Sequence, residues 1–186
     1  MVVERATGTS LERQLRRRIF APLGLEDTSF APDLRNSGRY AHGYAPSEHD
    51  GIVGSLATAR DRSTVNTSWA WAAGSIVSTA SDLSRFLGAL LQGRLLPPRL
   101  LELMRPAPGS RYGLGLAAFR TPCGTAIGHT GALLGTVSAA WSSPDGRPPC
   151  RRDEQQFPDV AVGRSRAEAA AGRILLWCLE LARKTN

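Results

Sequence analysis

The sequence predicts an α+β fold, in which helices and antiparallel strands occupy separate stretches of the chain. Residues 80–93 repeat apolar side chains at helical spacing. Residues 111–141 change to the shorter period of strands and include a hairpin. Residues 164–184 return to helical spacing. With 186 residues, the chain is long enough to form one domain around a hydrophobic core.

The N-terminal segment, residues 2–20, predicts a helix. Thr9 or Ser10 is expected to cap a helix that restarts after Gly8, and Pro22 is expected to stop it. Its apolar residues recur every four positions: Leu11, Leu15 and Ile19. Residues 26–66, which follow, hold turn-forming residues and little periodicity, and predict loops with brief strands.

Two helices are predicted in the middle of the chain. Thr79 or Ser81 offers an N-cap for the first, and Gly93 is expected to end it. The second follows Pro98 and ends before Pro106. Their apolar faces are expected to comprise Leu83, Phe86, Leu87, Leu90 and Leu91 in the first, and Leu100, Leu101, Leu103 and Met104 in the second.

Three strands are predicted next, at residues 111–119, 126–133 and 136–141, the last two joined as a hairpin. Residues 143–146 are a strong turn signal. Residues 147–163 begin with a polar, proline-broken stretch that predicts a poor strand, so the sheet is expected to lose a neighbour there. The chain is then expected to end in a helix over residues 164–184.

The net charge of +7 comes almost entirely from arginine, because the chain has one lysine, Lys184. A basic surface for nucleic acid is one interpretation. The absence of interleaved aromatic residues and of a nucleic-acid-binding motif favours a solvated, arginine-rich surface instead. No apolar run reaches the length of a membrane span, and the N-terminus lacks the pattern of a signal peptide, so this chain is expected in the cytoplasm.

Five short segments follow one another in a defined order: IFAPLGLEDTSF, HGYAP, AAGSIVSTASDLSRFLGALLQGRLL, YGLGL and GHTGALLG. In this order and spacing they resemble the penicillin-recognising serine hydrolases, which include D-alanyl-D-alanine carboxypeptidases, class C β-lactamases and related esterases. The resemblance implies an antiparallel sheet flanked by helices, incomplete here because an N-terminal helix and strands are missing. It also implies one truncated domain over residues 1–186, with helices and loops in 2–110, strands in 111–146, a divergent stretch in 147–163 and a helix in 164–184.

The resemblance places a motif of the substrate cleft at His129, Thr130 and Gly131. It implies that the first two side chains face the substrate carboxylate and help to move protons, and that Gly131 lets the substrate backbone lie close. The backbone N–H of Ala132 would be one of two oxyanion-hole donors. Trp69 is implied to line the same cleft. The relatives usually work outside the cell, and some appear to join the positions of two cysteines here, Cys123 and Cys178, by a disulfide.

Without the resemblance, His129 is a polar residue at a strand edge. A Ser-His-Asp base is disfavoured because the sequence has no Gly-x-Ser-x-Gly elbow. A metal ligand is disfavoured because no second ligand lies near it in the sequence. The sequence therefore predicts neither a metal nor a cofactor.

Two other motifs of the resembled family do not occur in this chain. Ser-x-x-Lys would need a serine three residues before Lys184, where Leu181 stands. Tyr-x-Asn is missing because the residues two positions after the three tyrosines are His42, Pro46 and Leu114. The chain is therefore expected to be the C-terminal part of such a hydrolase, without its nucleophile and inactive alone.

Three functions stay open from the sequence. The first is a truncated serine hydrolase whose cell-wall-type substrate, a small molecule or peptide, is processed only when an N-terminal half is supplied in trans. The second is a non-catalytic binding or partner module that keeps the wall of the cleft. The third, an arginine-rich nucleic-acid binder, is the least favoured.

Overall fold

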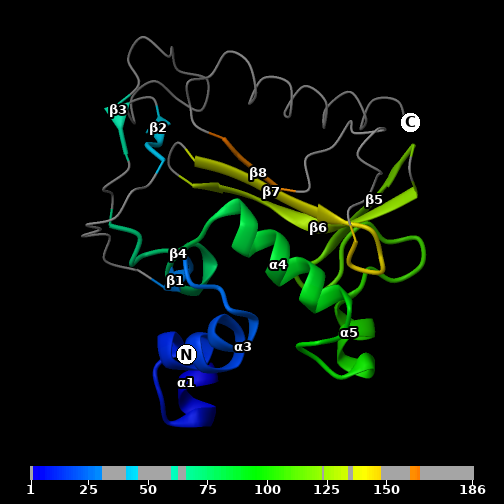
Figure 1. Cartoon of the computed structure of the whole chain (residues 1–186), viewed down its shortest axis with the longest axis horizontal. Helices are drawn as coiled ribbons and strands as arrows, with labels where there is room; N and C mark the ends of the chain where they lie inside the picture. Colours follow the sequence, from blue (N-terminus) through cyan, green and yellow to red (C-terminus); the bar gives the residue numbers. More distant parts are fainter. Residues whose placement is uncertain are drawn as a thin grey trace. The chain divides into compact units, whose positions relative to one another are not determined.

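The computed structural model of the chain describes residues 2–30, 41–45, 60–62, 66–122, 124–133, 136–147 and 160–163 (Figure 1). The chain divides into two compact units. The first consists of residues 1–32, 67–130 and 139–161, and the second of residues 33–66, 131–138 and 162–186. Among the described residues, no helix combines the length and the apolar character that a membrane crossing requires.

The N-terminal helix predicted over residues 2–20 is interrupted near Gly8, which adopts a φ of 67°. The chain restarts as predicted, because the Ser10 side chain caps the next helix and accepts a hydrogen bond from the backbone N–H of Arg13 at 3.3 Å. The resulting helical segments are α1 (Val2–Thr7), α2 (Leu11–Leu15), a π-helical turn (Arg16–Phe20) and α3 (Ala21–Leu23).

The two predicted central helices are confirmed as α4 (Ala80–Leu91) and α5 (Pro98–Met104). Thr79 is the N-cap of α4, and its hydroxyl accepts a hydrogen bond from the backbone N–H of Asp82 at 3.2 Å. Arg105, after α5, is extended because the proline that follows it disfavours helical backbone.

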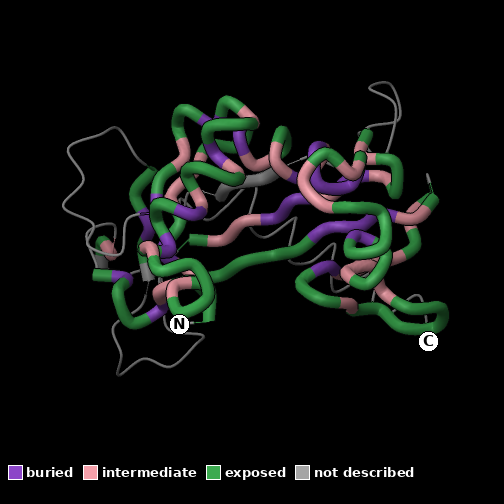
Figure 2. The backbone as a smooth tube through the Cα atoms, turned by 90° about the horizontal axis from the view of Figure 1, so that it is seen from below, coloured by how far each residue is buried: buried purple, intermediate pink, exposed green. Residues whose placement is uncertain are grey.

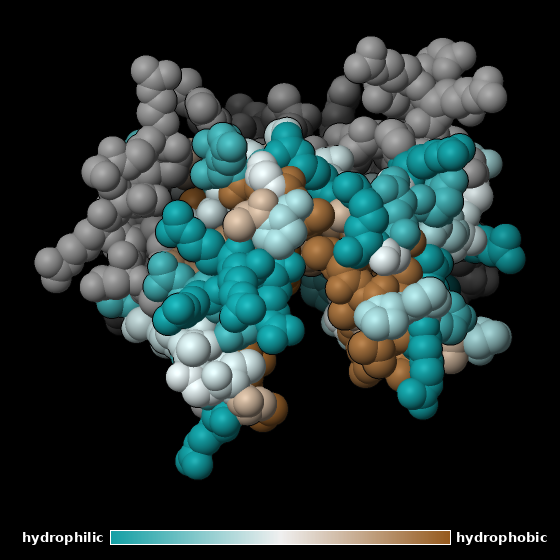
Figure 3. Space-filling view, turned by 60° about the horizontal axis from the view of Figure 1, so that its bottom comes forward, coloured by the Kyte–Doolittle hydropathy of each residue, from teal (hydrophilic) through white to brown (hydrophobic). Residues whose placement is uncertain are grey.

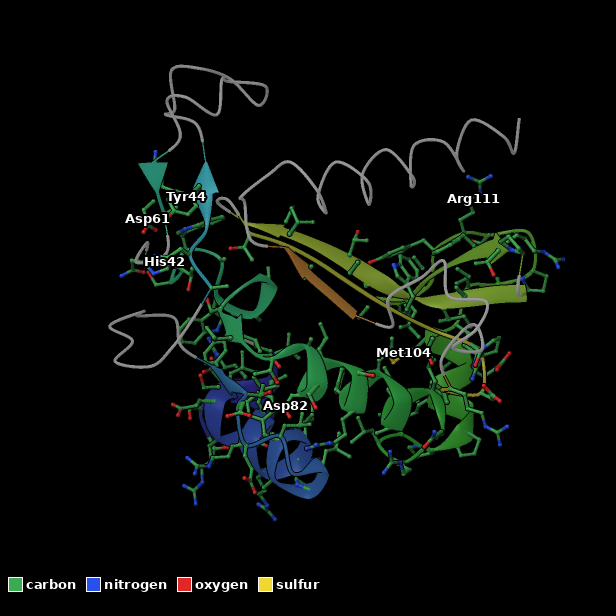
Figure 4. The ribbon with its side chains drawn as sticks, turned by 45° about the horizontal axis from the view of Figure 1, so that its top comes forward. His42, Tyr44, Asp61, Asp82, Met104 and Arg111 are labelled. Atoms are coloured by element: carbon green, nitrogen blue, oxygen red, sulfur yellow. The ribbon has the colours of Figure 1, made fainter. Side chains whose placement is uncertain are left out.

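A buried carboxylate ties the N-terminal segment to α4. Asp82 is only 3% exposed, and it accepts hydrogen bonds from the backbone N–H of Asp27 at 3.1 Å and from the Thr28 hydroxyl at 2.8 Å. Figure 4 labels it on the side of α4 that faces the N-terminal helices. Next to this tie, the two-residue strands β1 (Ser29–Phe30) and β4 (Ile76–Val77) pair antiparallel.

The main sheet has four strands in the order β5-β6-β7-β8. β5 (Ala117–Thr121) and β6 (Gly124–Leu133) pair antiparallel, from Ala117 opposite Gly128 to Thr121 opposite Gly124. β7 (Thr136–Ser142) begins so soon after β6 that the two neighbours can only be antiparallel. The predicted hairpin of the second and third strands is thereby confirmed.

The hydrophobic core of the first unit lies between the two central helices and the sheet. Figure 2 shows buried stretches on the strands and on the neighbouring helices. The buried residues of this cluster are Leu87, Leu90, Leu91, Leu101, Leu116, Ile127 and Ala140. The apolar face of α4 is thus buried against the sheet, as its periodicity predicts. The predicted face of α5 is only half right, because Leu101 is buried whereas Leu100 and Leu103 are 44% and 58% exposed.

The strand predicted over residues 111–119 is wrong in its first half, because β5 begins only at Ala117. Residues 111–116 form a turn that folds onto the end of α5, where the N–H of Leu114 donates to the carbonyl oxygen of Met104 at 3.0 Å. A Cβ atom at Gly113 would lie 2.3 Å from the same carbonyl oxygen, so this approach needs a glycine.

The expectation that the sheet lacks a neighbour beyond the third predicted strand is also wrong. β8 (Val160–Gly163) lies next to β7 in the sheet. Its sequence, VAVG, is apolar and partly β-branched, which suits a strand and contrasts with the polar stretch before it. The stretch 148–159 and the helix predicted over residues 164–184 lie outside the described residues.

The described part of the second unit includes a short pair of strands, β2 (Tyr44–Ala45) and β3 (Arg60–Asp61). His42 precedes β2, and its Nδ1 atom lies 2.7 Å from a carboxylate oxygen of Asp61. Figure 4 shows these two side chains together with Tyr44. Because a carboxylate oxygen accepts, this nitrogen of His42 is the donor.

Candidate ligand-binding strand

The residues singled out by the sequence lie where β6 leaves the core. Ala126, Ile127 and Gly128 are buried, and the next two residues, His129 and Thr130, are exposed. The pairing of β5 with β6 ends at Gly128, so β6 continues past the end of that ladder. The residues of β6 therefore change from buried to exposed at the point where its pairing with β5 ends.

Gly128 fixes the point at which β6 emerges. A Cβ atom at this position would lie 1.9 Å from the carbonyl oxygen of Ala140 on β7, closer than any side chain tolerates. The glycine therefore lets the two backbones approach at the edge of the core. His129 follows it directly and is placed by this contact.

His129 makes close contacts through both ring nitrogens. Its Nδ1 atom lies 2.5 Å from the carbonyl oxygen of Thr130, and its Nε2 atom lies 3.0 Å from the hydroxyl of Tyr112. The two rings meet edge to face, with centroids 5.6 Å apart and planes at 66°. This edge-to-face arrangement is one that aromatic pairs favour.

Tyr112 was missed as a site residue by the sequence reasoning, which took its segment for a strand. The turn over residues 111–116 brings it to His129, and an isolated β-bridge to Ala117 holds its backbone. Two glycines in this short segment, Gly113 and Gly115, were the available signal for a turn. Gly115 has a φ of 78°, which is typical of such a turn and unusual in a strand.

The rest of the predicted motif follows along β6. Gly131 and Ala132 are exposed and belong to the second unit. A Cβ atom at Gly131 would lie 2.8 Å from the hydroxyl oxygen of Ser138 on β7, so the glycine relieves a contact within the sheet as well. The oxyanion role of the Ala132 N–H stays a prediction.

Trp69 is 67% exposed, which is unusual for so large an apolar side chain. It sits in a compact turn closed by a hydrogen bond from the Ser75 hydroxyl to the carbonyl oxygen of Thr67, at 2.7 Å. Trp71 in this turn has a φ of 42° and packs edge to face on Phe30 at 5.1 Å. Within the described residues, no hydrogen bond or ring contact joins Trp69 to His129 or Thr130.

The disulfide implied between Cys123 and Cys178 involves two positions outside the described residues. Among the residues that are described, no three His, Cys, Asp or Glu side chains gather in a way that could hold a metal ion. The site that the structure builds is therefore a strand with a hydroxyl, an imidazole and backbone groups.

Apolar side chains are exposed near the turn that carries Tyr112. Leu100 and Leu103 on α5 are 44% and 58% exposed, and Leu114, bonded through its N–H to the end of that helix, is 66% exposed. Figure 3 shows apolar surface gathered on one part of the displayed face, beside strongly hydrophilic surface. Exposed apolar area of this kind is typical of surfaces that bind a ligand or another chain.

Comparison with known proteins gives one family and a set of related structures. The family model described as Beta-lactamase matches residues 1–162. A D-stereospecific amidohydrolase from Streptomyces sp. is 35% identical, with a TM-score of 0.66, over 78% of this chain and 44% of that protein. The D-amino acid amidase from Ochrobactrum anthropi SV3, in complex with D-phenylalanine, is 34% identical over 76% of this chain and 44% of its own, with a TM-score of 0.59.

A more distant match shows the fold alone. The octameric penicillin-binding protein homologue from Pyrococcus abyssi is 17% identical, with a TM-score of 0.57, over 96% of this chain and 40% of that protein. The chain thus spans less than half the length of each of these three proteins.

Proposed function

The chain belongs to the β-lactamase family, and from this premise we propose that it is the C-terminal part of a hydrolase that cleaves amides of D-amino acids by acyl transfer. The names of the two relatives above 30% identity support this substrate class, since one is a D-stereospecific amidohydrolase and the other a D-amino acid amidase. Esters and β-lactams are chemically related acyl donors for the same site.

The observation that carries this proposal is the exposed part of β6 at His129 and Thr130, where the strand runs past the end of its pairing with β5. A strand that runs past its neighbour offers backbone N–H and C=O groups to an extended ligand. In the proposed enzyme, the Thr130 hydroxyl and the His129 ring contact the ligand, and the N–H of Ala132 donates to the oxyanion. Trp69 contributes an apolar surface to the ligand.

The proposed reaction needs a nucleophile from outside this sequence. Acyl transfer in this family, by the resemblance described above, uses a serine activated by a lysine, and no serine here stands three residues before Lys184. Removing a catalytic nucleophile leaves only the small rate that binding and the oxyanion hole supply. We therefore propose that this chain acts together with a segment that carries Ser-x-x-Lys and Tyr-x-Asn.

Reconstitution tests the proposal. The chain is mixed with a separately expressed N-terminal segment of a β-lactamase-family hydrolase, chosen because its sequence contains Ser-x-x-Lys and Tyr-x-Asn, and ammonia release from D-phenylalanine amide is measured. We expect turnover only in the mixture and a clear preference over L-phenylalanine amide. No turnover at any ratio of the two polypeptides, although they associate, would contradict the proposal.

Two matched variants show whether this strand does the binding. Thr130→Val removes the hydroxyl in the exposed part of β6, and Thr125→Val removes one in the part paired with β5. We expect the first to lower kcat/KM by about threefold to tenfold, because one neutral hydrogen bond to the ligand is lost. The second is expected to leave kcat/KM within about twofold.

A non-catalytic binding module is the second candidate function, favoured by the exposed part of β6, from His129 to Ala132, in a sequence without the nucleophile motif. It predicts saturable binding of D-phenylalanine by the chain alone, seen as shifts of the backbone amide signals of β6, and no turnover in the mixture. Binding of DNA that weakens steeply with salt would instead support the nucleic-acid interpretation.

A further inference from the structure

The two hydrogen bonds of His129 define which of its two ring nitrogens carries the hydrogen. A backbone carbonyl oxygen only accepts, so the Nδ1 atom that faces Thr130 carries a hydrogen. In the neutral ring Nε2 is then an acceptor, and the hydroxyl of Tyr112, 3.0 Å away, donates to it. We propose that Tyr112 is a positioning residue that holds His129 in the Nδ1–H tautomer, with its ring fixed edge to face against that of Tyr112.

Burial does not explain this arrangement. His129 is exposed, and Tyr112 is 54% exposed, so neither ring is confined by a close-packed core. An exposed imidazole ordinarily samples several rotamers and exchanges its proton between both nitrogens. The two hydrogen bonds and the edge-to-face ring contact at 5.6 Å are therefore what restricts the ring.

Tyr112 is able to position another residue because its own backbone is held on both sides. On one side, the Ser110 hydroxyl donates to its carbonyl oxygen at 2.8 Å, and on the other, the Leu114 N–H donates to Met104 of α5 at 3.0 Å. The bridge to Ala117 adds a third tie. The hydroxyl therefore reaches His129 from a fixed turn.

The consequence for the site concerns which group of His129 a ligand meets. With Nδ1 bonded to Thr130 and Nε2 bonded to Tyr112, both ring nitrogens are already engaged. The ring therefore acts on a ligand through its fixed position beside Thr130, and an ordered site binds with a smaller loss of entropy. This part of the inference rests on the proposed function, whereas the tautomer of the free protein does not.

Nitrogen NMR of the imidazole rings tests the inference on the full chain without any activity. The chain has three histidines, which are assigned by replacing each in turn. In the neutral form we expect His129 to show a protonated Nδ1 and an unprotonated Nε2. An Nε2–H tautomer in the unaltered protein would overturn the inference, and this result requires no variant to fold.

A tyrosine-to-phenylalanine pair supplies the matched control. Tyr112→Phe removes the hydroxyl and keeps the ring, so we expect the ratio of Nδ1–H to Nε2–H at His129 to fall about threefold to tenfold, the effect of one neutral hydrogen bond. Tyr44→Phe removes a hydroxyl near His42, whose ring lies 6.4 Å from that of Tyr44, and is expected to leave His129 unchanged. An unchanged His129 ratio in Tyr112→Phe, or an equal change in both variants, would overturn the inference.

The reconstituted enzyme separates this inference from the proposed function. If the mixture turns over D-phenylalanine amide, Tyr112→Phe is expected to raise KM by about threefold to tenfold with little change in kcat. A normal KM in that variant would overturn the role of Tyr112 in the site. If the mixture shows no turnover while the tautomer result holds, the proposed function fails and the positioning of His129 by Tyr112 stands.

Discussion

Two glycines of β6 differ in what a side chain at their position would meet. A Cβ atom at Gly128 would overlap a backbone carbonyl oxygen of β7, whereas one at Gly131 would meet the end of the Ser138 side chain, which can turn away. We therefore expect Gly128→Ala to destabilise the chain by about 1–3 kcal/mol, and Gly131→Ala by clearly less. Urea unfolding of the two variants measures the difference, and equal midpoints would show that the β6–β7 approach is not this close.

A second prediction at the residue scale concerns Asp145, in the turn after β7. The pKa of Asp145 lies below its usual value, chiefly because the Ser143 hydroxyl donates to the carboxylate. A lowered pKa means that the ionised form is favoured in the folded state. The stabilisation is therefore present above the unfolded pKa and is lost as the pH falls through the folded pKa.

Ser143→Ala tests this cause directly. We expect the pKa of Asp145, followed by NMR of its carboxyl group, to move up toward the usual value. Ser142→Ala is the control, because the Ser142 hydroxyl donates to the carbonyl oxygen of Arg147 at 2.6 Å and has no bond to the carboxylate. A shift in the control as large as that in Ser143→Ala would assign the effect to the turn as a whole.

At the scale of elements, α5 has one face in the core and one on the surface. Leu101 is 7% exposed, and Leu103 on the same helix is 58% exposed. We expect Leu101→Gln to cost about 2–4 kcal/mol, since it puts an unpaired amide into the core, and Leu103→Gln to change stability by less than about 0.5 kcal/mol. Thermal unfolding followed by circular dichroism compares them, and similar losses would contradict the assignment of the two faces.

The elements show what local sequence could and could not predict. α4 followed from its capping threonine and its leucine spacing, because both act within a few residues of the chain. Local sequence predicts a strand over residues 111–116, where the structure has a turn, because apolar residues that alternate with glycines occur in both structures. Local sequence does not predict β8, because its apolar run has only four residues and follows a stretch that prolines interrupt. Its partner strand was also not evident from local sequence.

At the scale of the whole molecule, the candidate site also contains one part that local sequence predicts and one part that it does not. His129 and Thr130 were predicted from a motif that is contiguous in the sequence, and the structure exposes both. Tyr112 stands 17 positions away from His129, and their contact depends on a turn, a helix end and a strand that only the fold brings together. A pairing of this kind has no local signal, so sequence reasoning could not find it.

The whole sequence, rather than any one element, determines whether the chain can form an acyl-enzyme. A fluorescent penicillin labels enzymes of this kind by acylating a serine that a nearby base has activated. The one lysine of the chain, Lys184, has no serine three residues before it, and the two ring nitrogens of His129 are already bonded, to Tyr112 and Thr130. We therefore expect no covalent label on the purified chain, measured by in-gel fluorescence and intact mass.

The same labelling becomes informative in the mixture proposed above. There, the label is expected on the added N-terminal polypeptide, because the serine that forms the ester belongs to it, while this chain contributes the strand that holds the ligand. Thr130→Val is expected to slow labelling of that other polypeptide, although the variant chain itself carries no label. A label on this chain alone, removed by replacing one of its own serines, would show that it has a nucleophile and would contradict the division of roles.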